Sequence, residues 1–395
     1  MNPSPPPVPA AAAEAPAAYA VPRGVPLWDI FVTFLFIGAI SFGGGVVAYL
    51  RASLVLKKGW LDEEHFLSAL EISQALPGLN ATNMSIIVGD RLRGVAGAII
   101  AFAGMTLPGG SMVLALGVAY AANAHNPYVN AALVGVGAAA VGMLSAVTLQ
   151  IGHKQAQSGA QRRHHRRDGA DGQLPAHLAD LGVADRRPGR GVPVPPAQGR
   201  RRGRRRQIRG GLMNENLSVL GVFSLLSILA VGGGAAVLPE TKALVVETHH
   251  WLNDDQFRDI YGLGQVVPGP NMLMVIVIGY HVTGFVGALM AFLGFFLPAG
   301  AISWAASRVW DHFEGSPWRR ALQQGLAPLV VGLMASGTIS IARTAIDGRL
   351  TVVIAFAVFA GVYCVKKINP ALLVLGGGLV GLALLSGTGA GMPPS

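Results

Sequence analysis

The chain has 395 residues, of which 52% are hydrophobic and only 13% are charged. Its mean hydropathy is positive, and apolar runs close to the roughly 20 residues that cross a bilayer recur along it. These runs lack the period-2 alternation of barrel strands, so we expect helices. The composition excludes a soluble globular protein and predicts an all-α polytopic membrane protein with roughly ten membrane segments.

The net charge of +10 is confined to one stretch of the chain. Residues 154–211 hold Lys154 and 14 arginines against four aspartates, so the remainder is close to neutral. We predict that residues 154–212 are either a disordered loop, cytoplasmic by the positive-inside rule, or a stretch translated in a shifted frame. The stretch could bind anionic lipid or RNA. It lacks interleaved aromatic residues, so we expect no nucleic-acid partner.

Motifs for catalysis are missing from the sequence. Cys364 is the single cysteine, which excludes a disulfide framework and a thiolate metal site. There is no phosphate-binding loop, no metal-ligand spacing and no nucleophile motif. We therefore expect no enzyme activity, no cofactor and no metal.

In chain order, residues 1–26 are rich in Pro and Ala and predict a disordered tail. Residues 27–49 form a first membrane segment. A helix then begins at Asp62-Glu63-Glu64 and is interrupted at Pro77-Gly78, and the apolar piece after the break is too short to span alone. We expect the two pieces to form one interrupted segment. Residues 94–123 and 127–152 are two further hydrophobic runs.

The second half repeats this order. Trp251, Pro268-Gly269-Pro270 and a run of glycines match the first half at nearly constant spacing, which indicates an internal duplication. We place the first repeat at residues 27–153 and the second at 213–387, followed by a tail at 388–395. Residues 351–365 and 370–385 have no counterpart in the first half, so the first repeat is predicted to be truncated.

The paired Pro-Gly breaks are the predicted substrate site. A helix interrupted within a membrane exposes amide groups at its new N-terminus, and the helix dipole there favours an anion. Gln and Asn side chains near each break could cap the half-helix or donate to a ligand. The alternative is that Pro and Gly only kink two packed helices. The predicted residues are Gln74, Pro77, Gly78 and Asn80 in the first copy and Gln265, Pro268, Gly269 and Asn271 in the second.

Two glycine triplets allow close approach of the backbone to a ligand or to another helix. We include both among the substrate-binding residues, namely Gly43, Gly44 and Gly45 and then Gly232, Gly233 and Gly234.

A few charged residues stand close to these motifs. Glu71 lies in an apolar segment, so we predict proton coupling there, with Glu240 as a second candidate. If the helix of Glu71 is interfacial, this residue is an ordinary solvated acid. Arg51 aligns with Glu240 and could pair with it across the repeats. Arg51, Arg91 and Lys242 are candidates for attracting an anion, and the alternative is that they are interface anchors.

Several motifs resemble the chromate transporter family. They are Ser41-Phe42-Gly43-Gly44-Gly45, Gly59-Trp60-Leu61, Gln74-Ala75-Leu76-Pro77-Gly78-Leu79-Asn80 and the glycines between Gly89 and Gly97, each with its second copy. The resemblance covers both domains of the long members. It implies a multi-pass protein of the bacterial inner membrane that exports chromate, driven by the proton motive force, and so confers chromate resistance.

Two other functions stay open at this stage. The first is transport of another oxyanion, such as sulfate. The second is a membrane scaffold that uses its basic loop to bind lipid or RNA. The expected partners are chromate or a related oxyanion, the lipid bilayer and protons, and a homo-oligomer is compatible with the sequence.

Overall fold

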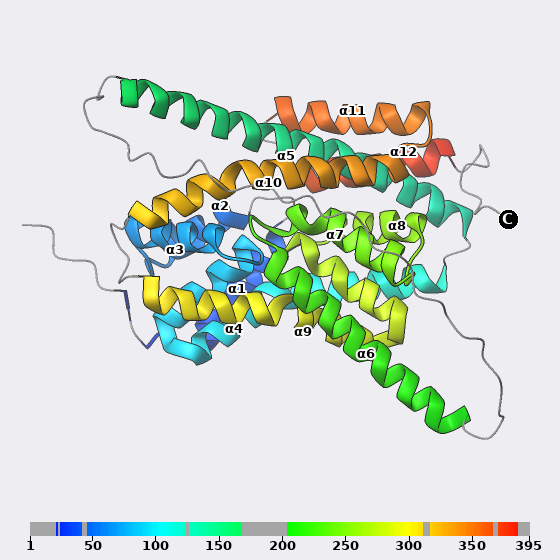
Figure 1. Ribbon diagram of the computed structural model, residues 1–395, viewed down its shortest axis with the longest axis horizontal. Helices are drawn as coiled ribbons and strands as arrows, with labels where there is room; N and C mark the ends of the chain where they lie inside the picture. The colour runs from blue at the N-terminus through cyan, green and yellow to red at the C-terminus, as the bar shows by residue number, and fades with distance from the viewer. Residues whose placement is uncertain are drawn as a thin grey trace, which may run out of the picture.

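The computed structural model describes residues 21–22, 24–41, 46–123, 126–167, 204–310, 317–365 and 370–385. These residues are almost entirely helical, with one isolated bridge between Pro77 and Val231 (Figure 1). The prediction of an all-α fold is confirmed. The glycine triplet Gly43-Gly44-Gly45, most of the predicted N-terminal tail, residues 168–203 and the C-terminal tail lie outside the described residues.

Helices of the first half precede an equivalent set in the second half. The first half contains α1 (Leu27–Ile40), α2 (Val46–Arg51), the π-turn η1 (Ala52–Lys57), α3 (Glu63–Ala75), α4 (Asn80–Ala122) and α5 (Pro127–Arg167). The second half contains α6 (Arg204–Leu229), η2 (Gly234–Val237), α7 (Leu238–Lys242), η3 (Ala243–Thr248), α8 (Asp254–Val266), η4 (Asn271–Leu273), α9 (Met274–Trp310), α10 (Pro317–Ala345), α11 (Arg349–Cys364) and α12 (Pro370–Leu385).

Three of the described helices are long and apolar enough to cross a membrane: Asn80–Ala122, Pro127–His153 and Met274–Val309. Four shorter apolar helices accompany them: Leu27–Ile40, Met213–Leu229, Arg349–Cys364 and Pro370–Leu385. The helices α5 and α6 also extend into the predicted loop at 154–212, as far as Arg167 and from Arg204.

The chain turns back on itself at Pro77-Gly78. Near this turn, Asn83 Nδ2 donates to the carbonyl of Ser73 at 3.4 Å, and at the far end Arg91 Nη1 donates to the carbonyl of His65 at 3.2 Å. Helix α3 and residues 80–92 of α4 therefore lie antiparallel, as a re-entrant hairpin that we call the first hairpin. The two pieces of the predicted interrupted segment thus lie side by side and do not continue in one direction, a geometry that the sequence analysis left unspecified.

The chain reverses direction a second time within α4, at Arg93 and Gly94. Gly94 has φ +62°, which an L-residue seldom adopts, and the backbones of Gly89 and Gly97 touch across the bend. In α9 the same reversal occurs at Gly284, where φ is +70°. Each long helix therefore consists of a short first arm and a long second arm, residues 95–122 in α4 and 285–310 in α9.

A pseudo-twofold axis relates the two halves. Phe102 and Phe292 occupy equivalent positions, and their ring centroids lie 5.8 Å apart. Thr148 and Thr338 are also equivalent, 190 residues apart, and their Oγ1 atoms lie 3.5 Å from each other. An equivalent pair in contact must lie beside the symmetry axis, so the axis passes through both contacts.

The second arm of α4 extends from the base of the first hairpin to the base of the hairpin in the second repeat. Its start, Gly94, lines the same cavity as Arg308 at the end of α9. Its far end contacts α8, where Tyr120 Oη donates to Asp259 at 3.1 Å. The second arms of α4 and α9 are thus antiparallel. The pseudo-twofold axis that relates them is therefore roughly perpendicular to the two arms. The repeats have inverted topology.

The second hairpin consists of α8, η4 and the first arm of α9. Along α4, Gly109 contacts Pro268 at the tip of this hairpin, Gly117 contacts Val277 and Tyr120 contacts Asp259. Both arms of the second hairpin therefore extend from their tip in one direction. In Figure 1, α3 lies toward the left end of the long axis and α8 toward the right end, so the hairpins enter from opposite ends.

Helices α11 and α12 pack against α5. The backbones of Gly135 and Gly377 touch, as do those of Gly142 and Ala355. Within the described residues the first half has no equivalent of these two helices. The domain limits themselves stay predictions.

Candidate functional site

The tips of the two hairpins are bonded to the opposite repeat. The backbone N–H of Gly78 donates to the carbonyl of Ala230 at 2.9 Å, and that of Gly269 donates to the carbonyl of Ser41 at 2.7 Å. Gly78 is buried against Ala299 on the second arm of α9. Pro77, Gly78, Pro268 and Gly269 therefore meet the opposite repeat at the middle of the molecule. The N–H groups of both glycines are already engaged.

Asn80 lies at the first position of α4, after Leu79, and no side chain caps this helix. The prediction that Asn80 caps the half-helix is wrong, since Asn83 braces the turn instead and donates to the carbonyl of Pro77 at 2.8 Å. The Oδ1 atom of Asn80 is buried and has no hydrogen-bond partner. It is therefore available to a ligand or to water.

The two predicted glutamines differ in burial. Gln265 is 5% exposed and its Nε2 atom has no partner, whereas Gln74 is exposed. Asn271 begins η4, and its side chain lies outside the described residues. The hydroxyl of Ser41 is also buried without a partner. Three unpartnered polar groups thus flank the hairpin tips, on Ser41, Asn80 and Gln265.

The second glycine triplet connects the two tips. Gly232 and Gly233 have φ of +88° and +108°, and Gly234 is buried against Leu79 and Met272. A side chain at Gly234 would overlap Met272. The triplet therefore allows helix packing at the junction, and its role in binding substrate stays a prediction.

The predicted pairing of Arg51 with Glu240 is wrong. Arg51 Nε instead binds Glu63 at 2.7 Å, and Lys242 binds Asp254 at 2.6 Å in the second repeat. Arg51 and Lys242 each precede a π-turn and are the true equivalents. Glu240 lies exposed in the first turn of α7. Both cations are held by a carboxylate of their own repeat, which weakens the prediction that they attract anions.

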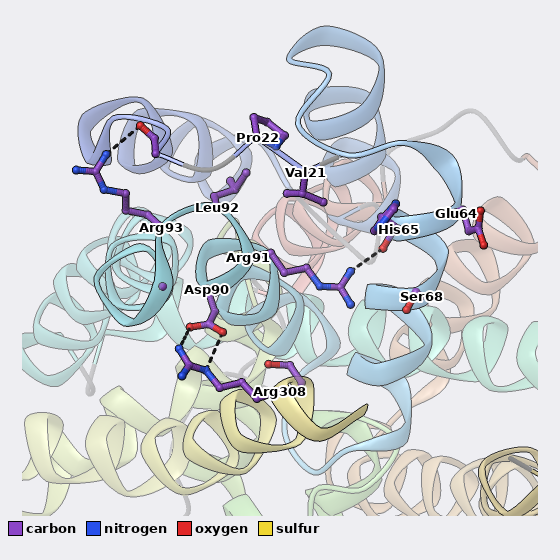
Figure 2. Close-up of a pocket in the computed structure, with 13 residues that line it drawn as sticks. Val21, Pro22, Glu64, His65, Ser68, Asp90, Arg91, Leu92, Arg93 and Arg308 are labelled. Carbon is purple, nitrogen blue, oxygen red and sulfur yellow. Dashed lines mark hydrogen bonds and ion pairs between the residues drawn. The ribbon is translucent and has the colours of Figure 1, made fainter. Parts of the chain in front are cut away.

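A polar cavity of about 1170 Å³ lies at the base of the first hairpin, between α3, the bend of α4 and the end of α9. Three arginines line it with two acidic residues, Glu64 and Asp90 (Figure 2). Arg91 contacts the carbonyl of His65, and Arg93 contacts the carbonyl of Gly24 at 2.9 Å. Of the predicted anion-attracting residues, Arg91 is the one that lines this cavity.

Asp90 joins the cavity wall to the opposite repeat. Its carboxylate accepts from Trp304 Nε1 at 3.0 Å and binds Arg308 Nη2 at 2.9 Å. The guanidinium of Arg308 lies 4.7 Å from the centroid of the Trp304 ring. Our sequence analysis missed this contact, since Asp90 and Arg308 are 218 residues apart.

The start of α3 is fixed beside the cavity by Asp62. This side chain accepts from the backbone N–H of His65 at 2.8 Å and lies 2.6 Å from the Nδ1 atom of the same residue. Burial by itself raises the pKa of Asp62, but these hydrogen bonds outweigh it, so the pKa lies below its usual value. The ionised cap holds His65 in the cavity wall.

Acidic side chains on the two hairpins differ in environment. Glu71 is exposed on α3, and its role in proton coupling stays a prediction. Asp259, on α8, is 4% exposed and contacts Arg258 and Tyr120. The sequence analysis did not single out Asp259. Its signal was an acidic residue five positions into a helix, beyond the first turn where Asp and Glu are common.

These features define an all-α membrane protein with inverted repeats and re-entrant hairpins that meet between them, an architecture typical of secondary transporters. The sequence profile of the chromate transporter family matches residues 28–167 and 217–382. The chain belongs to this family.

Known relatives resemble this chain over nearly its whole length. It is 27% identical to the chromate transport protein of Cupriavidus metallidurans over 90% of this chain and 92% of that protein. It is 26% identical to the chromate transport protein of Pseudomonas aeruginosa, over 92% and 93% of the two chains. Identity to a probable chromate transport protein of Synechococcus elongatus is 24%, over 87% and 91%. No solved structure matches the chain.

Proposed function

We propose that this protein is a secondary transporter of the bacterial inner membrane that exports chromate from the cytoplasm, driven by the proton motive force, and so confers chromate resistance. Family membership and the names of the relatives support chromate as the substrate. The inverted repeats support alternating access, in which a central site opens to either side of the membrane in turn.

The observation that carries this proposal is the junction of the two hairpin tips. Ser41 and Gln265 each bury a hydrogen-bond donor without a partner there, although buried polar groups in proteins are nearly always hydrogen-bonded. A tetrahedral oxyanion can accept from the Gln265 amide and from a serine hydroxyl. We propose that the dianion binds at this junction during transport.

The cavity at the base of the first hairpin supports an entrance on one side. The lining has three arginines against two carboxylates, so positive charge predominates, and a positive surface raises the local concentration of an anionic substrate. At the base of the second hairpin, by contrast, Tyr120 Oη donates to Asp259, which is 4% exposed. We interpret the arrangement as one state of an alternating-access cycle, open toward the cavity.

Chromate uptake into inverted membrane vesicles tests the proposed function. We expect uptake to exceed that of vesicles without the protein and to fall when a protonophore collapses the proton motive force. Sulfate in excess is the competitor that distinguishes chromate from a related oxyanion. Uptake that is unaffected by the gradient and equal to that of empty vesicles would refute transport. Preferential uptake of sulfate would establish the other oxyanion as substrate.

A further inference from the structure

A buried ion pair at the base of the second hairpin is not used by the mechanism proposed above. Arg258 Nη2 lies 2.9 Å from Asp259 Oδ1, and Arg258 Nη1 lies 2.8 Å from Asp255 Oδ1. The side chains of Arg258 and Asp259 are 11% and 5% exposed, whereas that of Asp255 is 54% exposed. Tyr120 completes the cluster through its hydrogen bond to Asp259 Oδ2.

The pseudo-twofold axis gives the cluster its position. The cavity lies at the base of the first hairpin, and these buried side chains lie at the equivalent base of the second hairpin. Ser68, which lines the cavity, is the counterpart of Asp259 in the first repeat. Asp259 thus occupies, in the second repeat, a position equivalent to one that lines the cavity of the first repeat.

The charge of the cluster links protonation of Asp259 to the binding of an anion. With both carboxylates ionised, the single guanidinium leaves a net charge of −1, which repels an oxyanion. Protonation of Asp259 makes the cluster neutral and removes one of the two carboxylates that bind Arg258. The guanidinium can then present its planar N–H fork to a tetrahedral oxyanion.

A second buried donor lies on the same helix. Gln265 follows Arg258 by seven residues, which places it on the same face of α8 two turns closer to the hairpin tip. Its Nε2 atom is buried without a partner. Arg258 and Gln265 therefore provide two donors between the base of the second hairpin and the junction.

We propose that Arg258 and Asp259 form a proton-linked oxyanion site, in which Arg258 binds the anion and Asp259 takes up one proton with it. This inference rests on the proposed transport function and specifies its coupling. A proton and a dianion then move in the same direction, so each cycle carries one net negative charge. The inside-negative membrane potential drives this net charge outward, whereas the pH gradient opposes the exit of the proton. The membrane potential is therefore the component of the proton motive force that drives export.

Few other titratable groups face Asp259. Arg258 and Asp255 are on its own helix and Tyr120 is on α4, while α5 and α10 present Gly137 and Ala345 beside Arg258. The start of α8 holds the pair of Lys242 and Asp254. Among the described residues, His281 on α9 and Arg343 on α10 are not bonded to Asp259.

The test uses the full chain in proteoliposomes, with chromate uptake measured against pH at a clamped membrane potential. In Asp259→Asn the amide replaces the protonated carboxyl, so we expect uptake to change less than twofold over a range in which the unsubstituted protein changes about tenfold per pH unit. The proton uptake that accompanies chromate, followed with an internal pH dye, should also fall in Asp259→Asn. Glu247→Gln, at an exposed carboxylate of η3 outside the cluster, is the control and should keep both. Chromate itself titrates in this range, and this contribution is equal in the two variants.

Two further variants keep the test informative if Asp259→Asn does not fold. Asp259→Glu should retain the pH dependence, and Arg258→Lys should raise the half-saturating chromate concentration at every pH. Equal pH dependence in Asp259→Asn and Glu247→Gln, or protons moving against chromate, would overturn the inference while the transport function stands. Absence of chromate uptake by the unsubstituted protein would instead refute the proposed function.

Discussion

The backbone N–H of Gly78 donates to the carbonyl of Ala230 at 2.9 Å, which joins the tip of the first hairpin to the end of α6 in the other repeat. The equivalent bond runs from Gly269 to Ser41, at the end of α1, at 2.7 Å. Each repeat thus stabilises the hairpin tip of the other. Any movement that opens the junction must break both hydrogen bonds or move the bonded segments together.

We predict that Gly78→Ala destabilises the protein and abolishes chromate uptake. Gly78 has φ +99°, and a Cβ atom here would lie 2.7 Å from that of Ala299. The backbone strain alone costs about 1–3 kcal/mol, and thermal unfolding in detergent measures the loss. Gly221→Ala is the control, because nothing lies within 4 Å of that position. A Gly78→Ala protein as stable and active as Gly221→Ala would contradict the importance of the junction.

Inverted topology predicts that equivalent residues face opposite sides of the membrane. Glu64 and Asp255 are both exposed near the start of their hairpins, and Cys364 is the single cysteine to be replaced first, by serine. We expect an impermeant maleimide to label Glu64→Cys from one face and Asp255→Cys from the other. Labelling of sealed right-side-out and inverted vesicles measures this. Labelling of both from the same face would refute the inverted arrangement.

The sequence alone predicts the helices, the repeats and the Pro-Gly breaks, since all three are local patterns of apolar, glycine and proline residues. It does not predict that the chain turns back at Pro77-Gly78. A break of this kind is equally compatible with a kinked span, and the direction is set by tertiary contacts such as that between Asn83 and Ser73. The inverted topology could not be derived either, because it depends on which ends of α4 and α9 meet.

Charged pairs were harder to predict than helices. The pairing of Arg51 with Glu240 came from the alignment of the glycine triplets, but the second copy has two additional residues between its triplet and its π-turn. This insertion makes Lys242 the equivalent of Arg51. Asp259 was missed because its partner Tyr120 is 139 residues away. Contacts between repeats leave no local pattern in the sequence.

We predict that the contact between Asp90 and Arg308 is partly restored by exchanging the two residues. Asp90 is only 10% exposed and accepts hydrogen bonds from two side chains, so Asp90→Asn should cost about 1–3 kcal/mol. The exchange of Asp90→Arg with Arg308→Asp recovers the ion pair but leaves the Trp304 indole without its acceptor. Denaturation of Asp90→Arg, of Arg308→Asp and of the double variant measures the coupling energy between the two residues. Additive losses would show that the pair does not contribute.

We predict that Arg91→Gln raises the half-saturating chromate concentration severalfold at low ionic strength. Arg91 lines the cavity, so its charge contributes to the field that an approaching anion meets. Salt screens this attraction, and the difference should shrink at about 0.5 M salt. Arg91→Lys keeps the positive charge and should keep the half-saturating chromate concentration close to that of the unsubstituted protein. Arg51→Gln is the control, because Arg51 is exposed and paired with Glu63 outside the cavity. Equal shifts in Arg91→Gln and Arg51→Gln, or a shift independent of salt, would exclude the cavity as the entrance.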